Sequence, residues 1–347
     1  MERVRHSGLS QQMKKKVTSP KEKKEEYDGN FGKVISTGST LLDLAISGGR
    51  IRGGGLPGGI LVEIFGPSGS GKTVFLSEIA GCVQREGGEI MYRDPEGRLD
   101  PKFAKLFGLE INNENYSRPD TIPQLFDPIK MWNPKNPNTI NGIFGDSLAA
   151  FSTEQEMGDD GDPYGMRRAK EFSIGLRKTC RLIADKNYLM VCSNQIRDVI
   201  GATQYQAKTA SPGGKAWTFY PSLRLTTNII KRHKIDRTFA GKEISKVIGV
   251  RTEIEVYKSS IWEPYHKAPV TIIFDYGIDD IRENLQFIKD YSKHNIYTIG
   301  GEGLDKSLVE SIKIIEEDHL EEKLKEEVID LWEDIESKFK QERKPKR

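Results

Sequence analysis

The sequence has few cysteines and no long apolar run. Its three cysteines, Cys82, Cys180 and Cys192, are scattered and form no C-x-x-C pair. This spacing argues against a disulfide scaffold and against a structural zinc site, so we expect the chain to work in the reducing cytoplasm. The absence of any run of 18 apolar residues excludes a membrane-spanning helix. The basic N-terminus has no apolar stretch of the kind that forms a secretory signal.

A large excess of one charge is also missing, because 53 basic residues nearly cancel 51 acidic ones. The charges are nevertheless segregated along the chain. Residues 1–33 carry nine Lys or Arg against five Asp or Glu, and residues 310–336 carry twelve acids against three bases. We predict a basic N-terminal segment over residues 1–33 that is either a solvated leader or an arm that touches nucleic acid or a neighbouring subunit. The last ten residues have a net charge of +5.

Apolar patterning predicts an α/β domain over residues 34–280. Short β-branched runs alternate with helical spacing up to about residue 193, which favours a mostly parallel sheet covered by helices. After residue 214 the alternation becomes that of antiparallel strands, which would extend the sheet by hairpins. Residues 281–347 are predicted to form a small C-terminal domain with an acidic helix and a basic tail. The expected strands cover residues 61–66, 89–94, 143–146, 188–193, 222–230, 250–258 and 270–276, and the expected helices cover 73–84 and 166–185.

One motif carries clear chemistry. Residues 66–73 fit G-x-x-x-x-G-K-[ST], between a predicted strand and a predicted helix. Backbone N–H groups of such a loop wrap a phosphate, and the helix N-terminus adds a favourable dipole. Lys72 would reach the β- and γ-phosphates of ATP, and Thr73 would hold Mg²⁺. The nucleotide-binding residues of this loop are Gly66, Pro67, Ser68, Gly69, Ser70, Gly71, Lys72 and Thr73.

Carboxylates at the ends of neighbouring strands are the candidate partners of this loop. Asp146 ends a predicted strand and could hold Mg²⁺ through water, although many strands end in an Asp that only caps a helix. Glu96 follows the second strand and could polarise the attacking water. From spacing alone, Asp94 and Asp100 compete with Glu96 for this role.

Several segments, taken in order, resemble RecA-type recombinases from about residue 34 to 300. The carrying motifs are Val34-Ile-Ser-Thr-Gly-Ser39, Gly55-Leu-Pro-Gly-Gly59, the phosphate loop, Glu96 with Leu99-Asp-Pro101, Asp146-Ser147, Ser193-Asn-Gln-Ile-Arg197 and the pair Gly213 and Gly214. The resemblance implies a RecA-like ATPase core that assembles into a filament on single-stranded DNA and pairs it with a homologous duplex. ATP would be bound between subunits and hydrolysed when DNA is present.

The resemblance also implies roles for single residues. Glu96 is similar to the water-activating glutamate, and Asp100 and Phe103 would contact the adenine, with Phe103 in place of the usual Tyr. Gln195 would sense the γ-phosphate and pass its state to the loop that follows. Lys258 matches the first of two lysines that reach the neighbour's γ-phosphate, but Ser260 stands at the second position.

Two loops are implied to bind DNA, at about residues 156–165 and 196–212. Both are long, polar and contain glycine, and without the resemblance they would be interpreted as two surface loops with a few arginines. Tyr164 and Ile200 match positions where such proteins insert a side chain between bases, and basic side chains nearby can pair with phosphates. The predicted DNA-binding residues are Tyr164, Arg167, Arg168, Arg197, Ile200, Gly213 and Gly214.

Departures from the family pattern leave a second hypothesis open. Ser260 and the polar N-terminal segment would suit a RecA-like accessory ATPase that binds DNA or a recombinase without exchanging strands itself. A ring instead of a filament would fit that alternative. Trp217 and Phe219 are expected to be core aromatics from their sequence pattern, although the family position of Phe219 is buried at the subunit boundary.

Overall fold

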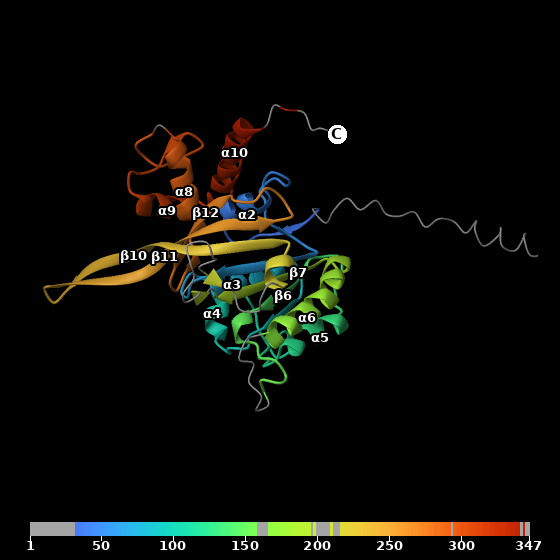
Figure 1. The fold of residues 1–347 in the computed structure, drawn as a ribbon. Helices are drawn as coiled ribbons and strands as arrows, with labels where there is room; N and C mark the ends of the chain where they lie inside the picture. Colours follow the sequence, from blue (N-terminus) through green and yellow to red (C-terminus); the bar gives the residue numbers. More distant parts are fainter. Residues whose placement is uncertain are drawn as a thin grey trace, which may run out of the picture.

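A computed structural model describes residues 32–157, 166–195, 197–198, 209–210, 216–292, 294–340 and 343. Within these residues one sheet of nine strands dominates the fold (Figure 1). Its order is β13 (Gly277–Ile278), β12 (Lys267–Ile273), β11 (Lys242–Ser259), β10 (Leu223–Phe239), β3 (Ile60–Gly66), β7 (Tyr188–Gln195), β6 (Asn141–Gly145), β4 (Ile90–Arg93) and β5 (Tyr116–Ser117). The strands from β10 to β5 pair in parallel, and those from β10 to β13 pair antiparallel. The predicted α/β architecture, a parallel sheet extended by antiparallel hairpins, is therefore confirmed.

Helices cover both faces of this sheet. Two hydrophobic clusters form, one on each face, because buried parallel strands such as β3 are apolar on both sides. The cluster on one face includes residues of α5 (Ile122–Met131) and α6 (Met166–Asp185), and the other includes residues of α2 (Thr40–Ser47) and α3 (Lys72–Arg85). The shorter elements are β1 (Val34–Ile35), β2 (Leu56–Pro57), α4 (Pro101–Lys105), β8 (Arg197–Asp198), β9 (Thr209–Ala210), α7 (Ala216–Phe219), β14 (Thr298–Ile299) and β15 (Glu302–Gly303). No described helix is long and apolar enough to cross a membrane.

A buried ion pair joins the central strands. Glu63 of β3 is 0% exposed and accepts a hydrogen bond from Arg224 Nε of β10 at 2.6 Å. The side-chain amide of Asn194, on β7, donates to the other carboxylate oxygen of Glu63 at 2.8 Å. Burial raises the pKa of Glu63, against the opposing charge of Arg224. Three adjacent strands are thus tied together by one carboxylate.

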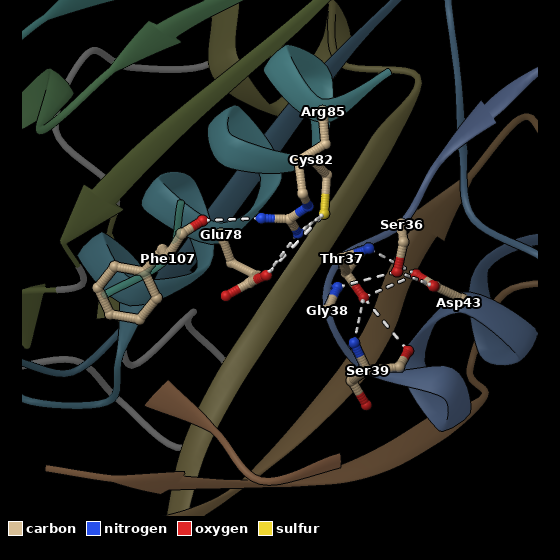
Figure 2. Close-up of polar contacts among 9 residues, drawn as sticks. All are labelled: Ser36, Thr37, Gly38, Ser39, Asp43, Glu78, Cys82, Arg85 and Phe107. Atoms are coloured by element: carbon tan, nitrogen blue, oxygen red, sulfur yellow. Dashed lines mark hydrogen bonds and ion pairs between the residues drawn. The ribbon is translucent and has the colours of Figure 1, made fainter. Parts of the chain in front are cut away.

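A second buried carboxylate shapes the turn before α2 (Figure 2). Asp43 accepts hydrogen bonds from the Ser36 hydroxyl at 2.5 Å, the Thr37 N–H at 2.8 Å and the Thr37 hydroxyl at 2.7 Å. Burial raises the pKa of Asp43 to about 6. These bonds fold residues 36–39 into a tight turn, and Gly38 in this turn has a φ of +83°.

The same turn lies against helix α3. A Cβ at Gly38 would come within 2.3 Å of Glu78 Cγ, so only glycine allows this approach. Arg85 lies about two turns further along α3. It donates to Glu78 at 3.0 Å and to the carbonyl of Phe107 at 2.9 Å (Figure 2). These contacts hold α3 between the N-terminal turn and the segment that carries Phe107.

Strands β10 and β11 are far longer than expected. The predicted strands over 222–230 and 250–258 are in fact 17 and 18 residues long. Their outer halves carry polar residues on both faces and therefore lack the alternation of a half-buried strand. The strand predicted over 270–276 also ends early, because Asp275 has a φ of +63° in the turn between β12 and β13.

The C-terminal region consists of α8 (Asp280–Tyr291), α9 (Leu308–Glu317) and α10 (Glu321–Phe339). Leu324 and Val328 of α10 are buried, and α10 packs against α8 and α2. On the exposed side of α10, Arg52 forms ion pairs with Glu326, Asp330 and Glu333. The proposed boundary at residue 280 stays a prediction, and most of the basic segment 1–33 lies outside the described residues.

We expect the Glu63–Arg224 pair to behave as a unit in stability. Glu63→Gln leaves a buried guanidinium without its counter-charge and should lower the free energy of unfolding by about 3–5 kcal/mol. The double variant Glu63→Gln/Arg224→Met should recover most of that loss, which denaturant titration of both proteins would reveal. Arg181→Met, which removes a surface pair between two exposed side chains, is the control and should change little. Additive effects of the two core substitutions would contradict this account.

Candidate nucleotide-binding site

The predicted phosphate loop connects β3 to α3. The strand ends at Gly66 and the helix begins at Lys72. Gly69 and Gly71 have φ values of +76° and +90°, which side-chain-bearing residues rarely adopt. A Cβ at Gly71 would also lie 2.3 Å from Ile272 Cδ1 of β12. The motif therefore sits between a strand and a helix, as phosphate binding requires.

The lysine of this loop is folded into it. Lys72 Nζ donates to the carbonyls of Gly66 at 3.1 Å and Pro67 at 2.7 Å. Burial lowers the pKa of Lys72, while the charges of Asp146 and Glu96 oppose that shift. The ammonium group of Lys72 thus lies at the phosphate loop, where it could exchange its hydrogen bonds to these carbonyls for bonds to phosphate oxygens.

A cavity of about 360 Å³ collects most of the residues predicted for the site. Its volume lies within the usual range for small-molecule pockets. The residues come from the ends of β3, β4, β6 and β7, because the carboxyl ends of parallel strands meet at one edge of the sheet. Those among the predicted site residues are Ser68, Gly69, Gly71, Lys72, Thr73, Glu96, Phe103, Asp146 and Gln195.

Asp146 stands directly after β6 and faces the phosphate loop. The hydroxyl of Ser193 donates to its carboxylate at 2.5 Å, and the hydroxyl of Thr73 donates to it as well. Burial raises the pKa of Asp146, and these two hydrogen bonds oppose that shift. The peptide bond between Asp146 and Ser147 is cis. A carboxylate and a hydroxyl side by side are the hard oxygen ligands that Mg²⁺ prefers alongside phosphate oxygens.

The structure separates the three carboxylates that compete for the water-activating role. Asp94 accepts from the N–H groups of Gly97 at 2.9 Å and Leu99 at 2.8 Å, so it shapes the turn. Asp100 caps helix α4 and does not line the cavity. Glu96 lines the cavity, and its one ion pair among the described residues joins it to exposed Arg98 at 3.0 Å. Glu96 is therefore the candidate whose carboxylate is least committed to the backbone.

The apolar wall of the cavity includes residues that sequence reasoning missed. Phe103 was predicted, and its ring lies 5.0 Å from that of Phe107. Phe107 and the β12 residues Ile272 and Ile273 line the same cavity. The apolar residues around Phe107 and in β12 are expected in any buried core, so their sequence pattern did not indicate that these distant segments share a site. The adenine contact predicted for Asp100 stays a prediction, with its carboxylate bonded to the N–H groups of the α4 first turn.

Lys258 lies outside this cavity. Its ammonium group donates to the carbonyls of Thr218 at 3.2 Å and Phe219 at 2.7 Å. Burial, followed by the nearby charge of Arg224, lowers the pKa of Lys258. The Ser260 hydroxyl donates to the carbonyl of Ser222 at 3.0 Å. A role of Lys258 at a neighbour's nucleotide stays a prediction.

The two aromatics beside Lys258 differ in exposure. Trp217 is 0% exposed and packs in the core against Phe172. Phe219 is 69% exposed, so the expectation that it is a core residue was wrong. Two aromatic residues of the four-residue helix α7 thus differ, one buried in the core and one exposed, which the sequence pattern could not distinguish.

Much of the two predicted DNA loops lies outside the described residues. This applies to Tyr164, Ile200, Gly213 and Gly214. The backbone of Arg197 is described and pairs with Ala210, so β8 and β9 form a short antiparallel ladder just after β7.

The arginines at the start of α6 differ in their surroundings. Arg167 is exposed, whereas Arg168 is half-buried. Arg168 donates to the carbonyls of Leu148 at 2.8 Å and Ala149 at 2.5 Å, which holds the loop after β6 against α6. DNA binding by either arginine stays a prediction.

A comparison with protein families supports the resemblance drawn from the motifs. The family model described as the RecA N-terminal domain matches residues 20–279, which is three quarters of the chain. The match spans the phosphate loop, every strand that contributes to the cavity and the β10–β11 hairpin.

Lys72→Ala should remove the charged contact of the loop with the phosphates and leave its backbone N–H contacts. We expect hydrolysis of ATP to fall by about 10²–10³-fold, because a positioned cation opposite developing negative charge is removed. Lys313→Ala removes an exposed lysine on α9 and is the matched control. Phosphate release assays on both variants measure the effect, and unchanged turnover in Lys72→Ala would refute the assignment of the loop.

Glu96→Gln should separate nucleotide binding from turnover. The amide keeps the shape of the side chain but cannot accept the proton of water, so hydrolysis should fall by about 10²–10⁴-fold. Nucleotide affinity, measured by titration with a fluorescent ATP analogue, should stay close to that of the unaltered chain. Glu310→Gln, which changes an exposed carboxylate of α9, serves as control, and normal turnover in Glu96→Gln would assign the role elsewhere.

Proposed function

Since the chain belongs to the RecA family, we propose that it is an ATP-dependent recombination protein. In this proposal it assembles on single-stranded DNA and promotes strand exchange with duplex DNA. The observation that carries the proposal is the position of β7. Its last residue, Gln195, lines the nucleotide cavity, and Arg197 of the predicted second DNA loop follows two residues later. A change at the nucleotide can therefore reach the DNA loop through a single strand.

The residues of the cavity fit ATP and Mg²⁺. The backbone of the phosphate loop and Lys72 hold the phosphates, and Thr73 and Asp146 hold the metal ion. Mg²⁺, when bound, neutralises charge on the phosphate oxygens. Glu96 orients the attacking water and accepts its proton, while Phe103 and Phe107 provide an apolar surface for the base. Gln195 distinguishes the states of the terminal phosphate through its side-chain amide.

DNA binding is proposed for the two loops. Arg167, Arg168 and Arg197 neutralise phosphates, and Tyr164 and Ile200 contact base faces. Such a mixture of backbone charge and base contact suits single strands of any sequence. Gly213 and Gly214 would let the end of the second loop approach the DNA closely.

Self-association is the remaining element of the proposal. Phe219 offers an exposed aromatic side chain where the family buries one between subunits. Lys258, whose ammonium group bonds to the Phe219 carbonyl, would reach the nucleotide of the neighbouring subunit after releasing its carbonyl contacts. Work in the cytoplasm is also part of this proposal.

Ser260 favours a second candidate function. Its hydroxyl is exposed and bears no charge at the position where the family has a second lysine. An accessory ATPase that binds DNA or a recombinase, and forms rings or small oligomers, would tolerate this change.

Electron microscopy and strand exchange distinguish the two candidates. With ATP, the Glu96→Gln variant should coat long single-stranded DNA in continuous helical filaments, because bound nucleotide is not consumed. The unaltered chain should transfer a strand between homologous DNA molecules, and Lys72→Ala should do neither. Discrete rings on DNA, together with no strand transfer, would favour the accessory ATPase.

A further inference from the structure

Among the residues that the structure describes, the outer halves of β10 and β11 form an arm with no other strand beside it. β10 pairs with β3 only over residues 223–226, and β11 pairs with β12 only over residues 249–255. Beyond these contacts the two strands pair with each other alone as far as Phe239 and Lys242. Figure 1 shows the resulting hairpin extending well away from the body of the molecule. Residues 234–246 of this arm are all exposed.

The tip of the arm is narrow. Ala240 and Gly241 form a two-residue loop with φ values of +50° and +74°, as in a type I′ turn. Phe239, immediately before this turn, is 74% exposed. A large aromatic side chain thus stands at the end of a ribbon only two strands wide.

The register of the arm separates its charges between two faces. Residues directly opposite in an antiparallel pair project from the same face. We call one face the basic face; it consists of Ile235 opposite Lys246, Arg237 opposite Ile244, and Phe239 opposite Lys242. It carries three cations, three large apolar side chains and no acid. The other face consists of Lys234 opposite Val247, Asp236 opposite Ser245, and Thr238 opposite Glu243.

The basic face continues toward the body of the molecule. β10 has no extra residue between Lys231 and Phe239, so Lys231 and His233 lie on the same side as Arg237. Lys231 and His233 line a cavity of about 220 Å³ at the base of the arm, between β11, β12 and α8. Two arginines of this cavity are already paired, Arg251 with Glu283 at 2.8 Å and Arg282 with Asp279 at 2.6 Å. Within the described residues, no ion pair engages Lys231 or the three cations of the basic face.

The stretch from Lys231 to Phe239 matches the dimensions of a DNA groove. Eight residue steps of about 3.3 Å span roughly 26 Å. A two-stranded ribbon fits the major groove, which is about 12 Å wide, and apolar side chains of DNA-bending proteins insert between base steps in the minor groove. An acidic protein surface could also attract the cations. The most acidic described helix, α10, already binds Arg52 through three carboxylates, so it is a weaker partner.

We propose that the basic face of the arm binds duplex DNA along its phosphates, with Phe239 entering a groove at the tip. This site is separate from the two predicted loops. It adds to the proposed function a place where duplex DNA is held outside the nucleotide-controlled loops, and it does not require ATP hydrolysis.

Two double variants with equal loss of charge test this proposal. Lys242→Ala/Lys246→Ala removes two cations from the basic face, and Arg232→Ala/Lys234→Ala removes two exposed cations from the opposite side of the same hairpin. Binding of a fluorescent 30-base-pair duplex without nucleotide is measured by anisotropy between about 50 and 200 mM salt. The slope of log K against log [salt] should shrink by about two for the first variant and stay unchanged for the second.

Phe239→Ser tests the aromatic side chain at the tip without changing the charge of the arm. Duplex affinity should fall while the salt slope stays that of the unaltered chain, because no phosphate contact is removed. Equal effects of both double variants, or no effect of either, would overturn the proposal. So would unchanged duplex binding accompanied by weaker single-strand binding, or by a change of oligomeric state in light scattering, because the arm would then bind a single strand or a second copy.

The arm and the proposed function fail in different ways. Stimulation of ATP hydrolysis by single-stranded DNA should be the same in the Lys242→Ala/Lys246→Ala variant as in the unaltered chain. If this variant loses duplex binding but single-stranded DNA still stimulates its ATP hydrolysis, the result supports both the arm proposal and the proposed recombinase function. If the unaltered chain shows no stimulation, the arm still stands on the duplex data while the recombinase function fails.

Discussion

Glu63 has no exposed surface and lies in the strand that leads to the phosphate loop. A carboxylate in that position is tolerated only because Arg224 and Asn194 both bond to it. Each partner belongs to a neighbouring strand, so the pairing of β10, β3 and β7 is specified by one charge. Two of these strands end at the nucleotide cavity, and the third leaves the sheet to become half of the arm. A slip of β7 by one residue would turn Gln195 away from the cavity, because alternate residues of a strand face opposite sides.

The nucleotide cavity follows from that arrangement. Parallel strands bring their carboxyl ends to one edge, where Lys72 lies at the start of α3 beyond β3, Asp146 directly follows β6, and Gln195 ends β7. The hydrogen bonds from Thr73 and Ser193 to Asp146 join α3, β6 and β7 before any ligand arrives. The same edge leads directly into β8. The proposed nucleotide contact at Gln195 and the proposed DNA contact at Arg197 are therefore two positions apart, a distance over which a shift of one side chain can move a loop.

The phosphate loop, the parallel sheet and helix α6 could be predicted because each leaves a local signal, a motif or a period. The apolar wall could not, since Phe107 and Ile272 are brought together by β12 from the far end of the sheet. Sequence spacing could not distinguish Asp94 from Glu96 as the water-activating residue. Only the structure shows that the Asp94 carboxylate accepts hydrogen bonds from Gly97 and Leu99. The arm was not predicted because both faces of this two-stranded ribbon are exposed. Without a buried face, its sequence does not show the alternation of apolar and polar residues that marks a half-buried strand. Helix α2 was missed although Ser39, whose hydroxyl caps it, stood within a recognised motif.

The central claim is that the nucleotide cavity controls DNA contact through β7. The most direct measurement is the rate of ATP hydrolysis with Mg²⁺, with and without long single-stranded DNA, in the unaltered chain and in Gln195→Ala, at a stated salt concentration because phosphate contacts weaken with salt. We predict that DNA stimulates the unaltered chain severalfold, and that Gln195→Ala keeps the DNA-free rate but loses the stimulation. Equal rates with and without DNA, under conditions where binding to the unaltered chain is demonstrated, would contradict the claim.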